Sequence, residues 1–139
     1  MPAPSRWMIR CSLLYLLVGF TIGAIILISK AYPAYSWVWM LLSVHIEMLI
    51  FGFIIQFTMG TAYWILPRFL KDKSRGNSVL ANIMVLSLNL GIIFVVMNTF
   101  VSAFVPFRLL GRGFEIIAVI IFIGLHWKRA VTYRNETMQ

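Results

Sequence analysis

The sequence predicts an all-α protein, an antiparallel bundle of four transmembrane helices with both termini in the cytoplasm. Of its 139 residues, 61% are hydrophobic and only 12% are charged, and the mean hydropathy is +0.91. A soluble domain of this size cannot bury so much apolar surface, so lipid must be part of its solvent. Four apolar stretches, separated by short polar breaks, can each cross the roughly 30 Å hydrocarbon core of a bilayer.

The first helix is expected at residues 9–29, where an apolar run follows Arg6 and Arg10. We interpret it as a retained helix, because the run is longer than that of a signal peptide and no clear cleavage site follows it. Gly19 and Gly23 lie four residues apart, a spacing of small residues that favours close packing against another helix.

The remaining helices are expected at residues 37–66, 78–104 and 110–127, within a single membrane domain that covers residues 1–139. The second would be about 45 Å long, so it must tilt or protrude from the bilayer. The third contains three asparagines that we expect to bond to neighbouring helices: Asn82, Asn89 and Asn98. The fourth ends near His126, whose Trp and Lys neighbours indicate an interfacial position.

The basic residues set the expected orientation and partner. A net charge of +8 would suggest nucleic acid for a soluble protein, but here the cations flank membrane spans, so lipid headgroups are the expected partner. Only Lys30, Arg108 and Arg112 lie on the side opposite the termini. The positive-inside rule then predicts cytoplasmic termini in a multi-pass protein of a prokaryotic inner membrane.

His45 is the principal candidate for function. It lies about 12 Å below the outer end of the second expected helix, where a titratable ring is costly unless it is bonded or ligated. Gly52 shares its face and would leave room for a flat macrocycle, with Met48 among the apolar walls. The spacing leaves two interpretations equally open: an iron ligand, or a neutral imidazole that donates to a neighbouring carbonyl.

Charged residues on the same outer side form a second candidate set. Glu47 is turned about 200° from His45 on a helix, so it is expected to bond an Asn or Arg of a neighbour, take up a proton or contact a quinol. Arg108 and Arg112 could hold haem propionates. A simple pair between Arg112 and Glu115, three residues apart, is the alternative. Glu115, like Glu47, is also a candidate for taking up a proton or contacting a quinol. His126 lies near the opposite membrane face and cannot ligate the same iron.

Residues 45–68 resemble the second transmembrane helix of subunit I in the superfamily of haem-copper oxidases and nitric oxide reductases. In that family the helix begins with an axial histidine of the low-spin haem and ends with a glycine, an aromatic pair and a Leu/Val-Pro. The matching positions here are His45, Gly60, Tyr63, Trp64, Leu66 and Pro67. Residues 110–115 are similar to a Gly-Arg-x-x-x-Glu entry of a later helix in the nitric oxide reductase branch, with one residue fewer. The resemblance implies that His45 ligates haem near the outer face.

The chain lacks the later helices that carry the family's second low-spin ligand and its binuclear centre, so no complete active site is expected. Because a low-spin haem takes two axial ligands, one haem b per two chains is expected, shared across a homodimer, unless a partner subunit supplies the second His. The expected role is that of a small b-type cytochrome, which exchanges electrons with quinol or an outer-side carrier. A haem-free accessory subunit of a respiratory complex and a quinone-binding module, using His45, Glu47 and nearby Trp rings, stay open as alternatives.

Overall fold

The computed structural model describes residues 1–68, 76–101 and 106–136, with backbone only at 33, 34, 128 and 131–136. Regular structure within these residues is helical throughout. Four segments among them are long and apolar enough to cross a membrane: Ala3–Ser29, Tyr35–Ile65, Ser78–Phe100 and Phe107–Trp127. The prediction of an all-α protein with four helices that could span a membrane is therefore confirmed.

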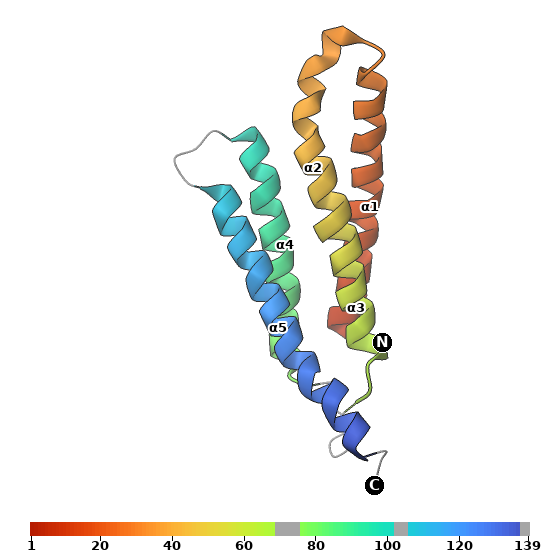
Figure 1. Ribbon diagram of the computed structural model, residues 1–139, viewed down its shortest axis with the longest axis vertical. Helices are drawn as coiled ribbons and strands as arrows, with labels where there is room; N and C mark the ends of the chain where they lie inside the picture. Colours follow the sequence, from red (N-terminus) through yellow and green to blue (C-terminus); the bar gives the residue numbers. More distant parts are fainter. Residues whose placement is uncertain (69–75, 102–105, 137–139) are drawn as a thin grey trace.

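The spans pack as two pairs (Figure 1). Helix α1 (Ala3–Ser29) lies along the second span, and α4 (Ser78–Phe100) lies along α5 (Phe107–Glu136). Between the pairs is a cluster of buried apolar side chains that includes Met8, Met59, Tyr63, Met84, Leu88, Ile92 and Leu125. The interior is thus apolar over most of its length, and the polar groups that interrupt it need specific partners.

The second span is assembled from four consecutive helical segments. They are the 3₁₀-helix η1 (Pro33–Leu41), α2 (Leu42–Glu47), the π-helix η2 (Met48–Ile55) and α3 (Gln56–Ile65). The π-helical part was not predicted, because its sequence is apolar on every side and has no periodicity that would reveal the wider turn.

Two helices are longer than the apolar stretches that predicted them. Helix α1 begins at Ala3 instead of residue 9, because Pro4 falls in the first turn, where its missing N–H costs nothing. Helix α5 begins at Phe107 instead of 110 and continues beyond 127 to Glu136. Apolarity marks the membrane-embedded part of a helix, whereas its ends are set by backbone hydrogen bonds and caps.

The third span begins at Ser78 as predicted, since the side chain of Asn77 accepts hydrogen bonds from the backbone N–H groups of Val79 and Leu80. It ends at Phe100 instead of residue 104. Residues 102–105 lie outside the described part of the chain.

Glycines allow α1 to approach the second span closely. A Cβ atom added at Gly19 would lie 2.7 Å from Cδ2 of Leu49, and one added at Gly60 would lie 2.8 Å from Cβ of Met8. The hydroxyl of Ser5 donates to the Gly60 carbonyl at 2.6 Å. The small-residue spacing of α1 thus marks a helix interface, as expected from the sequence.

Candidate functional site

His45 lies in α2 and faces α1. Its Nδ1 atom is 2.8 Å from the carbonyl oxygen of Gly19. A carbonyl oxygen only accepts hydrogen bonds, so Nδ1 carries a proton and donates it, and Nε2 is the ring nitrogen that this bond leaves unused. Gly23 makes room for this ring, because a Cβ atom there would lie 2.5 Å from Cε1 of His45.

A cavity of about 190 Å³ adjoins the His45 ring, between the end of α1 and the beginning of the second span. Gly23, Lys30 and Trp39 also line it, and the Lys30 ammonium lies 5.5 Å from the centre of the Trp39 ring. The cavity is smaller than the roughly 300–1,000 Å³ of pockets that enclose a drug-sized ligand. A macrocycle at His45 would therefore need a cover from outside this chain.

The space beside Gly52 is taken by another helix. A Cβ atom at Gly52 would lie 2.6 Å from Cγ of Tyr15 in α1. The glycine does face α1, as does His45, but it offers no room for a macrocycle, which corrects the expectation from the sequence. Met48 is half-buried, with its Cβ atom close to Gly19.

Glu47, Arg112 and Glu115 form a charged triad between α2 and α5. The Arg112 guanidinium donates from Nη2 to Glu47 Oε2 at 2.7 Å and from Nη1 to Glu47 Oε1 at 3.3 Å. The same Nη1 donates to Glu115 Oε2 at 2.6 Å. Both carboxylate residues are buried, with 2% and 3% of their surfaces exposed. Arg112 also stacks on Phe51, 4.6 Å from the ring centre.

The triad changes the roles expected for the arginines. Arg112 was a candidate for holding haem propionates, but in this structure its guanidinium is bonded to Glu47 and Glu115. Arg108 is exposed and lines a different cavity, of about 400 Å³, together with Asn98 and Arg112. The structure therefore does not bring either arginine to the cavity beside His45.

His45 and Glu47 also point to different helices, α1 and α5. This divergence follows from their two-residue spacing. A quinone site built from both side chains, which was one alternative from the sequence, is not formed.

The Glu115 side chain lies where α4 and α5 approach each other closely. A Cβ atom at Gly91 would lie 2.7 Å from Cγ of Glu115 and 2.9 Å from the Gly111 carbonyl oxygen. The hydroxyl of Ser87 donates to the carbonyl of Phe114 at 2.8 Å, which adds a second link between these helices. The Glu115 side chain therefore packs directly against the backbone of α4 at Gly91.

His126, near the end of the fourth candidate span, is buried. Only 5% of its surface is exposed, and its Nδ1 donates to the Phe122 carbonyl at 2.6 Å. The Tyr63 ring packs edge-on at 5.7 Å between ring centres. Nε2 has no hydrogen-bond partner among the described residues. The Trp and Lys neighbours predicted a position near the membrane interface, but they did not predict that this face of α5 contacts Tyr63 of α3.

Arg129 donates hydrogen bonds to the backbone at the end of α3, a role that the sequence did not predict. Its Nε donates to the Pro67 carbonyl at 2.9 Å, and Nη2 donates to the Leu66 carbonyl at 2.6 Å. These bonds satisfy carbonyl groups at a helix end that have no partner within the helix. Its position in a basic cluster gave no signal of this pairing, which depends on how α5 passes the end of α3.

A polar network lies between the two pairs of helices. Asn89 of α4 accepts hydrogen bonds at Oδ1 from the Tyr15 hydroxyl at 3.0 Å and from Gln56 Nε2 at 3.4 Å. It therefore joins α4 to α1 and α3, which confirms the interhelical role predicted for this asparagine.

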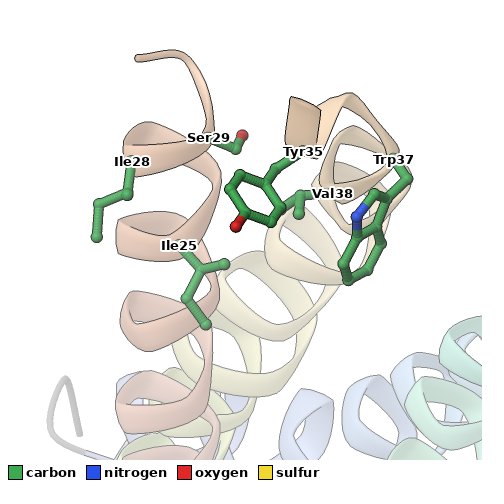
Figure 2. Close-up of a pocket in the computed structure, with 6 residues that line it drawn as sticks. All are labelled: Ile25, Ile28, Ser29, Tyr35, Trp37 and Val38. Carbon is green, nitrogen blue, oxygen red and sulfur yellow. The ribbon is translucent and has the colours of Figure 1, made fainter. Parts of the chain in front are cut away.

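Two aromatic residues, Tyr35 and Trp37, line another cavity, of about 310 Å³ (Figure 2). The Tyr35 ring points into the space between η1 and α1, and Trp37 lies on the side of Tyr35 that is away from α1. Almost all of the lining is apolar, so this cavity carries no chemistry of its own.

The described residues contain no group of three or more His, Cys, Asp and Glu side chains that could hold a metal ion. An iron at His45 would thus have a single imidazole ligand from one chain. Comparisons of the chain with protein families, with curated proteins and with solved structures find no match.

Proposed function

We propose that this chain is a small b-type cytochrome of a prokaryotic inner membrane, in which His45 Nε2 is an axial ligand of haem b. The observation that carries the proposal is the hydrogen bond from Nδ1 to the Gly19 carbonyl. Histidines that bind metals commonly donate their other ring N–H to a carbonyl, which fixes the tautomer and the ring orientation. When bound, the haem iron supplies one-electron transfer.

Two copies of the chain would share the haem. A low-spin haem takes two axial ligands, and a two-fold axis would present one His45 from each protomer. The small cavity beside His45 supports this arrangement, because the macrocycle then lies between protomers and not within one. A different subunit with its own histidine is the second way to complete the site.

Lys30 takes the role first expected for Arg108 and Arg112. It lines the same cavity as His45 and makes no ion pair with a carboxylate among the described residues. Its ammonium group is therefore suited to hold a haem propionate. Gly23 leaves room for the ring of His45 in this position, because a side chain at residue 23 would collide with the imidazole.

The proposed topology is an antiparallel bundle with both termini in the cytoplasm, which places His45 toward the outer face. The distribution of Lys and Arg supports this orientation, because most of these residues lie on the side of the termini and only Lys30, Arg108 and Arg112 lie on the other side. Electrons would come from quinol or pass to a carrier on the outer side.

The test is the haem content of the purified full-length protein, measured as the pyridine haemochrome after expression with haem supplied. We expect about one haem per two chains, and loss of the haem in His45→Ala. His126→Ala, which removes the other imidazole, should keep the haem. Circular dichroism shows whether each variant remains helical. A helical His45→Ala variant with the haem content of the unaltered protein would overturn the proposal.

A haem-free accessory subunit of a respiratory complex is the second candidate. Internal bonding favours it, because both His45 and the triad already have partners within the chain. This function predicts a colourless protein that copurifies with a larger complex and still does so after His45→Ala.

A further inference from the structure

The triad of Glu47, Arg112 and Glu115 contains more negative than positive charge. Glu47 contacts two nitrogens of Arg112, in the fork geometry that pairs one carboxylate with one guanidinium. That pair is already neutral. Glu115 reaches the same Nη1 atom at 2.6 Å, so an ionised Glu115 would leave one net negative charge inside the bundle.

Within the described part of the chain, no other charged group near Glu115 offsets that charge. Helix α4, which packs directly against Glu115, has no ionisable side chain, and neither has the π-helix η2. The ionisable groups that face Glu115 are Arg112 on its own helix and Glu47 on α2. The excess charge therefore has to be neutralised at the triad itself.

The position for this neutralisation is Oε1 of Glu115. This atom is buried and has no hydrogen-bond partner among the described residues, and the whole residue is only 3% exposed. An unpartnered anionic oxygen is costly in an apolar interior, whereas a carboxylic acid is tolerated much better. A cavity of about 240 Å³ between η2 and α5 is lined by both Arg112 and Glu115.

We propose that Glu115 is a proton-binding site within the membrane, occupied at neutral pH by one proton on Oε1. The bound proton makes the triad electrically neutral, and Oε2 still accepts the hydrogen bond from Arg112. This inference is independent of haem: the site involves α2 and α5, whereas His45 faces α1.

Infrared spectroscopy of the full-length protein in lipid nanodiscs tests the proposal. At pH 7 the protein should show the carbonyl band of a protonated carboxylic acid. Labelling with ¹³C-glutamate should shift this band, which distinguishes it from a lipid ester. The Glu115→Gln variant should lose the band. Glu136→Gln, which lies beyond the last span, should keep it.

The Glu47→Gln variant gives the sharpest result. It removes the carboxylate that pairs with Arg112, so Glu115 becomes the single anion beside the guanidinium and ionises. The glutamic acid band should therefore disappear although Glu115 is still present. Unaltered protein without the band at pH 7, or a band that persists at full strength in Glu47→Gln, would overturn the proposal. The Glu47→Gln variant also keeps the test valid if Glu115→Gln does not fold.

Discussion

The contact between α4 and α5 makes a strong prediction for Gly111→Ala. A Cβ atom at Gly111 would lie 2.6 Å from Cγ2 of Val95 and 2.7 Å from the Gly91 carbonyl oxygen. The second of these atoms belongs to a helix backbone and cannot rotate away. The two helices would have to separate, and forcing extra volume into a packed interface costs about 1–3 kcal/mol.

A helix propensity gain opposes part of this loss. Replacing Gly by Ala in a helix stabilises it by roughly 0.5–1 kcal/mol, so we expect a net destabilisation of about 1 kcal/mol for Gly111→Ala. Gly124→Ala in the same helix is the matched control, because no atom lies within 4 Å of a Cβ atom there. That variant should be as stable as the unaltered protein or slightly more stable.

The assay is reversible unfolding in mixed micelles by increasing the fraction of sodium dodecyl sulfate, followed by circular dichroism. The quantity compared is the free energy of unfolding of the two alanine variants. Equal stability of Gly111→Ala and Gly124→Ala would refute the close backbone approach on which the position of Glu115 depends.

Three further substitutions test separate parts of the structure. Gly23→Ala should lower haem content, since the added methyl group would displace the His45 ring and its bond to the Gly19 carbonyl; the pyridine haemochrome measures this. Arg129→Gln should lower the free energy of unfolding by roughly 1.5–3 kcal/mol, the value of a hydrogen bond to a charged donor, in the same detergent titration. Asn89→Leu removes the acceptor shared by α1 and α3 and should cost about 1–3 kcal/mol, because it leaves buried donors unpaired.

Each of these has a control and a contrary outcome. Gly113→Ala, where a Cβ atom meets nothing within 4 Å, should keep its haem; equal haem in Gly23→Ala would contradict the role of that glycine. Thr21→Val is the control for the two polar substitutions, because its exposed hydroxyl donates only within its own helix. Arg129→Gln or Asn89→Leu with the stability of Thr21→Val would show that those bonds do not hold the helices together.

The sequence was sufficient to find the spans because hydropathy depends on composition alone. The extended start of α1, the continuation of α5 to Glu136 and the π-helix η2 were not found. Those features depend on backbone hydrogen bonding, which an apolar stretch does not encode in its periodicity.

For the site, spacing within one helix predicted particular residue pairs, whereas contacts between helices were predicted only by residue type, as in the expected bond of Glu47 to an Asn or Arg of a neighbour. The three-residue spacing predicted the pair of Arg112 and Glu115, and the two-residue spacing separated His45 from Glu47. The contact between Glu47 and Arg112 joins positions 65 residues apart and depends on how α2 and α5 pack. The contact of His126 with α3 has the same kind of origin, since the Tyr63 ring packs edge-on against the imidazole.

The most direct test of the haem assignment is the optical spectrum of the dithionite-reduced protein, recorded with the His45→Ala variant alongside. Two imidazoles on one low-spin haem should give a sharp α band that the variant lacks. A protein that contains no porphyrin even when haem is supplied, or a spectrum that the substitution leaves unchanged, would contradict the assignment of His45 as the iron ligand.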